Sequence, residues 1–273
     1  MIFKNEIVKK VSELIVEKNC IINEEVKVFL DEYRGPFSKV LKENYKIAHD
    51  EGLPLCQDTG LVEFFVFIGN EVKLEEPIKD TLNEIVETVY IHNPFRYSIV
   101  ADPLFERKNT QNNTPAVVHV FETPGNKLEI RFLIKGGGSE NLSRLYMMRP
   151  SSNIENFKRA VIEHIKENGA KGCPPLHVGI GVGGTSDMAM VLSKLALTKD
   201  FKERNSDPKY ANLETELVRE LNELKIGFQG LGKGVSVFSV HIEVSPTHIA
   251  TLPLGIAADC YLCRKGVIEF EDR

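Results

Sequence analysis

Three cysteines set among loop-forming residues constrain the fold of this chain more than any other feature. Cys56 lies in Leu-Cys-Gln-Asp-Thr-Gly, Cys173 in Gly-Cys-Pro-Pro and Cys260 in Ala-Asp-Cys-Tyr-Leu-Cys-Arg-Lys. A cysteine that serves packing usually lies in an apolar run and acts as a small hydrophobe, which fits Cys20 before two isoleucines. We therefore expect a fold that brings three distant loops together around a metal centre.

Composition and charge narrow the class of protein. With 273 residues the chain can bury a large core in one or two domains. No uninterrupted apolar run reaches about 18 residues, so no membrane-spanning helix is expected, and the first residues lack the order of a signal peptide. The odd cysteine count fits a cytoplasmic, reducing compartment in which thiols stay available. A net charge of −5 without a dense Lys/Arg tract argues against nucleic acid as a partner.

Hydrophobic periodicity predicts a mixed α/β (α+β) fold. Helical spacing predicts helices over 7–15, 26–30, 38–50, 79–91, 155–167, 186–197 and 213–224. Short apolar or alternating runs predict strands over 61–68, 176–182 and 235–244, and a strand pair over 117–121 and 128–134 joined by a turn at 123–126. No internal repeat or long linker is evident. We predict a single domain over 1–273, in which a helical portion, 1–52, packs on a sheet-containing portion, 53–273.

Two glycine-rich stretches could bind ligands. The stretch from Gly179 to Gly184 has the spacing of a dinucleotide fingerprint, but a polar loop rather than a strand follows its helix, so the βαβ unit is missing. A broader interpretation is a turn whose N–H groups hold an anion at a helix N-terminus. The three glycines after Lys135 form either a flexible hairpin tip or, as we favour, a carboxylate-binding loop in which a substrate approaches the main chain.

The Cys260–Cys263 pair is a lone C-x-x-C. A zinc ribbon needs a second such pair, which the chain lacks. Cys56, Cys173, Cys260 and Cys263 could still close one structural zinc site. A zinc-stabilised binding module without catalytic activity therefore remains an alternative.

Five runs, taken together and in this order, resemble the class I (iron–sulfur) fumarate hydratase and L-tartrate dehydratase family in its α subunit. The resemblance covers nearly the whole chain. It rests on Pro54 to Gly60, Asn109 to Pro115, Lys135 to Asn141, Gly172 to Pro175 with Gly179 to Ser186, and Cys260 with Arg264 and Lys265. The family usually has a second arginine where this chain has Lys265, and the two side chains are not interchangeable at a bidentate site.

The resemblance implies a [4Fe–4S] cluster held by Cys56, Cys173 and Cys260, with one iron lacking a protein ligand. Most clusters are closed by four thiolates and transfer electrons. An open iron can instead act as a Lewis acid toward a substrate hydroxyl and carboxylate. The resemblance also implies that the cluster is sensitive to oxygen. Cys263 is a competing thiol, and whether it can replace Cys260 stays open.

The resemblance also implies the substrate-binding and catalytic residues. Gln57 and Asp58 would contact the substrate, with Asp58 a possible proton handler, and Arg96 would bind a carboxylate. Gly137 would offer its backbone N–H. His248 resembles a histidine that reaches the active site from just before the third ligand, and His241 is the less favoured candidate.

The implied reaction is reversible hydration of a dicarboxylate, chiefly fumarate to (S)-malate, a step of the tricarboxylic acid cycle. The alternative within the family is dehydration of L-tartrate to oxaloacetate. Single-chain members carry a second domain with further active-site residues. We therefore expect a separate β subunit, a dimer of αβ units, and no activity of this chain alone.

Overall fold

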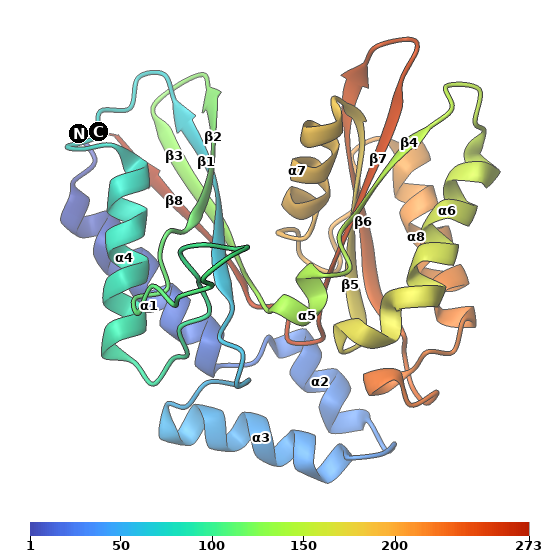
Figure 1. The fold of residues 1–273 in the computed structure, drawn as a ribbon, viewed down its shortest axis with the longest axis horizontal. Coiled ribbons are helices and arrows are strands. Elements are labelled where there is room, and N and C mark those ends of the chain that lie inside the picture. The colour runs from blue at the N-terminus through green and yellow to red at the C-terminus, as the bar shows by residue number, and fades with distance from the viewer. Residues whose placement is uncertain (273) are drawn as a thin grey trace. The chain divides into compact units, whose positions relative to one another are not determined.

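The computed structural model describes residues 1–272, which group into two compact units (Figure 1). The first comprises Met1–Asp31, Lys39–Gly136 and the segment from Arg264 onward, and the second comprises Glu32–Ser38 and Gly137–Cys263. Helices and two mixed sheets confirm the predicted α+β class. The predicted single domain over 1–273, with its helical portion over 1–52, stays a prediction. Within residues 1–272, no helix has the length and apolar character needed to cross a membrane.

The first unit is a sheet with helices on one face. Its elements are α1 (Lys4–Cys20), α2 (Glu24–Glu32), α3 (Ser38–Glu51), β1 (Leu61–Gly69), α4 (Ile78–His92), β2 (Val117–Thr123), β3 (Lys127–Lys135) and β8 (Lys265–Glu271). Alternate residues of β1, namely Val62, Phe64 and Val66, are buried in one core with side chains of α1 and α4 (Figure 1). Period-two alternation on the strand and helical spacing on α1 produce these two matching apolar faces.

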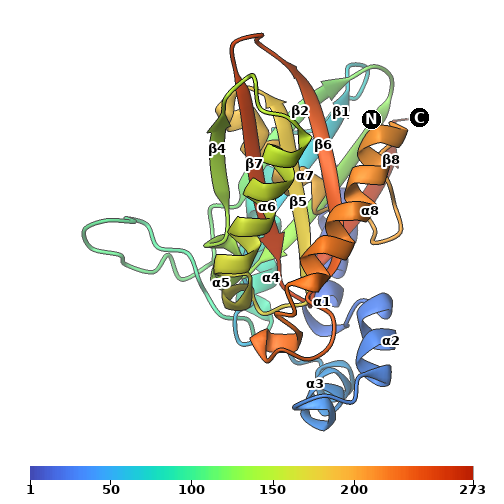
Figure 2. The same ribbon diagram turned by 90° about the vertical axis from the view of Figure 1, so that its right-hand side faces the viewer.

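The second unit places its sheet between helices. Its elements are α5 (Gly137–Glu140), β4 (Arg144–Met148), α6 (Ile154–Asn168), η1 (Gly169–Gly172), β5 (Leu176–Gly184), α7 (Ser186–Ala196), α8 (Pro208–Glu223), η2 (Phe228–Gly230), β6 (Val237–Thr247) and β7 (Leu252–Asp259). Helices α6 and α8 share an apolar core with β5, β6 and β7 on one face, and α7 lies on the other (Figure 2).

The two sheets have the same strand arrangement, although the sequence shows no repeat. Their orders are β2-β1-β3-β8 and β6-β5-β7-β4. In each, the second strand pairs parallel with the first and antiparallel with the third, and the third pairs antiparallel with the fourth. The fourth strands are exchanged along the chain, because β4 follows β3 and β8 follows β7. The chain thus passes from one unit to the other at the glycine run and at the Cys260 run, and also at both ends of Glu32–Ser38.

The predicted pairing of 117–121 with 128–134 is wrong, because β1 lies between β2 and β3. The connecting turn passes the end of β1, where Asn70 N–H donates to Thr123 O at 2.8 Å and Gly125 N–H to the Asn70 Oδ1 at 2.9 Å. A Cβ at Gly69 would lie 2.1 Å from Gly125 O, so only glycine fits there. Strand β1 is apolar and lies in the middle of the sheet, with a neighbour on each edge. It pairs with β2 and with β3, which would have paired with each other in the predicted hairpin.

Strands β4, β7 and β8 were not predicted from the sequence. Strand β7 contains proline, glycine and two alanines without alternation, and seven of its eight residues are buried. Buried positions in the middle of a sheet do not alternate between polar and apolar, so periodicity does not detect them. Helix α8 also begins earlier than predicted, because the Asp207 carboxylate accepts the Lys209 N–H at 2.8 Å and Pro208 occupies the first turn.

Candidate active site

Most candidate residues lie at one end of the sheet of their own unit. In the first unit the Cys56–Gly60 loop enters β1 and Gly136 follows β3, and Leu61 pairs with Lys135. In the second unit Cys173 precedes β5 and Cys260 follows β7, and His177 pairs with Asp259. Antiparallel pairing therefore places the start of one strand beside the end of its neighbour, and the candidate loops meet at these ends.

In the first unit, the carboxylate of Asp58 points toward Gly136. Its Oδ1 accepts the Gly60 N–H at 3.0 Å. A Cβ built on Gly136 would lie 2.9 Å from Asp58 Oδ2 and 3.9 Å from Arg264 Nη2. Arg264 is buried, and its Nη1 donates to Asn19 Oδ1 at 2.9 Å. Arg264 is therefore a buried cation behind the Asp58 loop, and the absence of a Cβ at Gly136 leaves room for the carboxylate.

Replacing Gly136 by alanine is expected to displace Asp58 with little loss of stability, because the colliding atom is the end of a flexible side chain. If Asp58 handles a proton, a shift of about 1 Å should lower kcat about 100-fold. Gly138→Ala is the matched control, since its nearest atom would be Lys171 O at an ordinary 3.6 Å. Steady-state kinetics and thermal melting of both variants check this. Equal kcat values for the two would exclude the role of Asp58.

Arg96 presents an exposed guanidinium on a fixed backbone. Thr59 Oγ1 accepts the Arg96 N–H at 3.0 Å and donates to Arg96 O at 2.9 Å. The guanidinium makes no hydrogen bond or ion pair with any other part of residues 1–272. An exposed cation with an anchored backbone suits the capture of a carboxylate.

Cys173 and Cys260 lie on neighbouring loops of the second unit, where Cys173 O accepts the Tyr261 N–H at 3.2 Å. Cys173 is exposed, with its backbone in the left-handed region at φ 55°, and Cys260 is half-buried. Cys263 is buried, and its Sγ donates to Cys260 O at 3.1 Å. The turn thus points the Cys263 thiol inward, which favours Cys260 over Cys263 as a ligand.

Gly137 lies close to this thiol pair. It is exposed and begins α5, whose Ser139 hydroxyl donates to Asp259 Oδ1 at 3.3 Å. The same oxygen accepts the Cys260 N–H at 2.8 Å. Asp259 therefore fixes α5, which begins in the glycine run, against the Cys260 loop. The carboxylate-binding interpretation of the glycine run stays a prediction.

Cys20 has the packing role expected from its sequence. Its side chain is part of the first unit's core, its Sγ lies 3.6 Å from Gly52 O, and burial raises the pKa of its thiol. A protonated, buried thiol is inert. Cys56, by contrast, is partly exposed.

His248 lies far from the thiols of its own unit. It is exposed in the turn between β6 and β7, at the opposite end of β7 from Cys260 (Figure 2). Eight strand residues at about 3.3 Å each span about 26 Å. His248 Nδ1 accepts the Ala250 N–H at 3.1 Å, so its Nε2 carries the proton of the neutral ring. His241, the less favoured candidate, is fully buried with its ring 5.0 Å from that of His177.

The cavity beside His248 is lined by hydroxyl-bearing side chains and by the apolar side chains of Met147, Pro246 and Pro253. It measures about 510 Å³. Its lining includes His248, Thr185, Ser186, Thr247 and Thr251. The structure therefore separates His248 from the thiol loops of its own unit and places it at a cavity of mixed polar and apolar lining.

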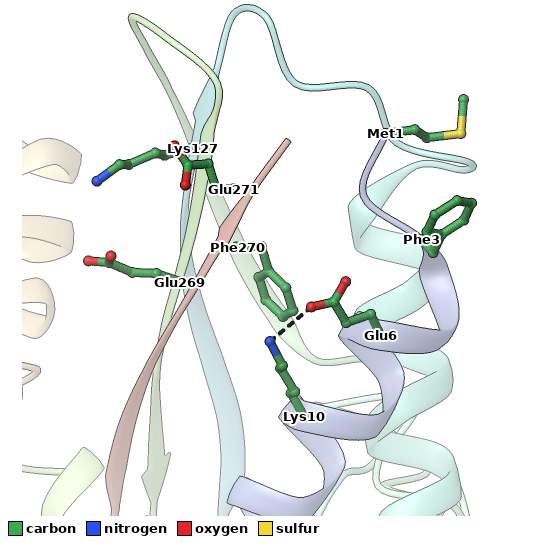
Figure 3. A pocket seen from close by; sticks show the side chains of 8 residues that line it. All are labelled: Met1, Phe3, Glu6, Lys10, Lys127, Glu269, Phe270 and Glu271. Carbon is green, nitrogen blue, oxygen red and sulfur yellow. Dashed lines mark hydrogen bonds and ion pairs between the residues drawn. The ribbon is translucent and has the colours of Figure 1, made fainter. Parts of the chain in front are cut away.

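A groove of about 790 Å³ in the first unit holds none of the candidate residues (Figure 3). It lies between α1 and β8, and its charged lining consists of Glu6, Lys10, Lys127, Glu269 and Glu271. Lys10 is already paired with Glu6 at 2.9 Å. Met1 also lines the groove, and its N-terminal ammonium is paired with Asp272. With three carboxylates in its lining and two of its cations already paired, this groove is unsuited to a dicarboxylate.

The glycines of the apparent dinucleotide fingerprint serve packing. A Cβ at Gly179 or Gly181 would lie 2.0 Å from the carbonyl oxygens of Ser193 and Ala189 in α7. A polar loop does follow α7, as expected, but the inferred absence of a βαβ unit is wrong, because β6 pairs parallel with β5 after α7 and α8. At the α7 N-terminus, the Thr185 side chain and backbone N–H groups lower the pKa of Asp187, so a carboxylate of the chain already lies there.

Sequence reasoning missed three buried polar residues of the first unit, Thr59, Tyr90 and Asn113. Together they hydrogen-bond to the backbone of the Cys56–Gly60 loop and of the Arg96 segment. Thr59 and Asn113 lie in two of the runs that carry the family resemblance, 54–60 and 109–115. Tyr90 gave no signal, because its spacing on α4 is that of an ordinary core residue.

Comparison with known proteins assigns the chain to a family. The model of the fumarate hydratase (Fumerase) family matches residues 10–269, and the chain belongs to that family. It is therefore an enzyme of the hydro-lyase class, as the sequence analysis predicted.

Curated relatives cover almost the whole chain. It is 38% identical to the putative L(+)-tartrate dehydratase subunit alpha of Methanocaldococcus jannaschii over 94% of this chain and 95% of the relative. It is 30% identical to the L(+)-tartrate dehydratase subunit alpha of Escherichia coli K12 over 97% of this chain and 92% of the relative. The relative from Escherichia coli O157:H7 has the same name, identity and coverage.

Proposed function

We propose that this chain is the α subunit of an iron–sulfur hydro-lyase that hydrates fumarate to (S)-malate together with a separate β subunit. The observation that carries the proposal is the loop cluster of the second unit, where Cys173, Cys260 and Gly137 are fixed side by side. Dehydration of L-tartrate is the second candidate, favoured by the names of the relatives.

The donor set fits a cluster with three protein ligands. Cys56, Cys173 and Cys260 are solvent-accessible thiols on loops, whereas Cys20 and Cys263 are buried. Within residues 1–272, no three His, Cys, Asp or Glu side chains lie close enough to hold a single metal ion. Cys56 belongs to one unit and the other two thiols to the second. A bound [4Fe–4S] cluster with an open iron would supply Lewis acidity toward the substrate hydroxyl.

The residues of this chain bind and orient the dicarboxylate. Arg96 donates to one carboxylate, and the Gly137 N–H donates to a substrate oxygen. Gln57, exposed next to Cys56, contacts the substrate through its amide. Asp58, held by the Gly60 N–H, accepts or returns the proton that C–H bond breaking or formation requires.

The position of His248 supports the proposal of a dimer of αβ units. Because about 26 Å of β7 separates it from Cys260 of the same unit, it serves the site of a second copy of this chain. In a two-fold dimer each copy would then give its thiol loops to one site and its His248 turn to the other. The site is incomplete without that second copy.

An ordered arm in the first unit gives a partner an apolar contact. Leu104 and Phe105 are 73% and 83% exposed, and Asp102 Oδ1 accepts both of their N–H groups, at 2.7 and 2.9 Å. The arm is part of the loop between α4 and β2, which extends away from the sheet of the first unit in Figure 2, and it follows Arg96 along the chain. A large apolar tip held in water fits a protein contact, and we assign it to the β subunit.

The chain purified anaerobically is expected to be inactive alone and to hydrate fumarate once its β subunit is added. Iron, sulfide and zinc contents are measured on the same samples, and L-tartrate is assayed beside fumarate. Robust hydration by the chain alone would refute the two-chain site. Zinc without acid-labile sulfide would establish the binding module instead, and full activity after prolonged exposure to air would exclude the open iron.

A further inference from the structure

The Thr59 hydroxyl makes two hydrogen bonds to the backbone of Arg96. Its hydroxyl accepts the Arg96 N–H at 3.0 Å and donates to Arg96 O at 2.9 Å. Thr59 is 1% exposed, so water cannot replace these bonds. It also lies in the Cys56–Gly60 loop, one residue after Asp58. The hydroxyl thus joins the loop of the first thiol to the candidate carboxylate-binding arginine.

Asn113 makes a second link between the same two segments. Its Nδ2 donates to Gly60 O at 3.0 Å, and its Oδ1 accepts the Ser98 N–H at 2.7 Å. Asn113 is 1% exposed, with φ 60°, a left-handed conformation that asparagine tolerates better than most residues. Asn109 supports the same segment by donating to Tyr97 O at 2.9 Å. The Asn109–Pro115 run thereby holds the residues that follow Arg96.

Tyr90 completes the network from α4. Its hydroxyl lies 2.6 Å from Thr59 O and 3.2 Å from Gly60 O, and the side chain is fully buried. Burial raises the pKa of Tyr90, so the hydroxyl remains a proton donor. The Tyr90 hydroxyl thus holds the carbonyl groups of Thr59 and Gly60 in place. Asn113 and the Thr59 hydroxyl in turn hydrogen-bond this loop to the Arg96 segment.

We propose that Thr59 and Asn113 are positioning residues for dicarboxylate binding, which set the place of Arg96 relative to the Gln57–Asp58 pair. This inference rests on the proposed function. Arg96 itself is exposed on an irregular segment between α4 and β2. Without its two links the guanidinium would sample many positions, and preorganisation for the carboxylate would be lost.

The test uses the complete αβ enzyme. Thr59→Val keeps the shape and removes both bonds to Arg96, Thr59→Ser keeps the hydroxyl, and Asn113→Ala removes the second link. Thr59→Val and Asn113→Ala should each raise KM about tenfold, because an Arg96 that is no longer preorganised binds the carboxylate less tightly, with kcat per cluster nearly unchanged. Thr59→Ser should restore the KM of the wild type. Calorimetric titration with succinate, a saturated dicarboxylate that cannot react, should show the same loss in Kd.

Two controls separate positioning from stability. Thr81→Val removes another buried hydroxyl of the first unit, which donates to Glu76 at 2.8 Å, and Asn126→Ala removes an amide that donates to Asp272 O at 2.8 Å. Both should lower the melting temperature and leave KM and the succinate Kd unchanged. Unchanged KM and Kd in Thr59→Val and Asn113→Ala, or a Thr59→Ser variant as impaired as Thr59→Val, would overturn the inference. If Arg96→Ala also leaves KM unchanged, the role of Arg96 in the proposed function fails as well.

Discussion

Replacing Cys56, Cys173 or Cys260 by serine is expected to reduce the activity of the αβ enzyme to background and to abolish cluster binding. A hydroxyl is a far poorer ligand for iron than a thiolate, and two remaining thiolates cannot retain the cluster. Iron and sulfide analysis of anaerobically reconstituted protein checks this. The wild type should bind about four of each, and each variant should lose both.

Cys263→Ser and Cys20→Ser are the matched controls. Serine at 263 can still donate to Cys260 O, to which the thiol now donates at 3.1 Å. Serine at 20 puts a polar group among apolar neighbours and should cost about 1–3 kcal/mol of stability without loss of iron. Loss of the cluster in Cys263→Ser, with retention in Cys260→Ser, would identify Cys263 instead of Cys260 as the third ligand. Retention in all three ligand variants would refute the cluster site.

Replacing His248 by asparagine is expected to lower kcat by about 10²–10⁴, the usual contribution of a general acid or base, with iron content unchanged. The side chain is exposed and its contact with the Ala250 N–H is local, so the fold should be unaffected. Ile249→Ser is a suitable control, because Ile249 is 92% exposed in the same turn. Equal activity of the two variants would exclude His248 from catalysis.

Mixing two inactive variants tests whether His248 serves a second copy. In a hybrid dimer of His248→Asn and Cys260→Ser chains, one site receives both wild-type residues and the other receives neither. Random mixing makes half of the dimers hybrid, so about a quarter of the wild-type activity should return. Failure of any mixture to regain activity, with hybrid formation verified, would place both residues in a site of one chain.

Much of the local structure was predictable because it depends on neighbouring residues. The helix predicted over 79–91 corresponds to α4 and the strand over 61–68 to β1, within a residue or two at each end. The reading of Cys20 as a packing residue was confirmed by its burial. Asp58 was recognised because it lies in one of the matching runs, and Arg96 through the family resemblance alone; the roles of both stay proposals.

Local sequence patterns predicted the long helices, most strands, the loop character of Cys56, Cys173 and Cys260, and the family, but not the short helix α5 in the glycine run. Long-range packing set four further features: β1 separates β2 from β3, Gly179 and Gly181 allow α7 to pack closely on β5, Cys263 points inward, and His248 lies at the far end of β7. The physical reason is the range of the interactions. Periodicity and turn chemistry act over a few residues, whereas strand order, helix–sheet approach and the end of the sheet at which a side chain lies depend on pairing between segments far apart in the chain.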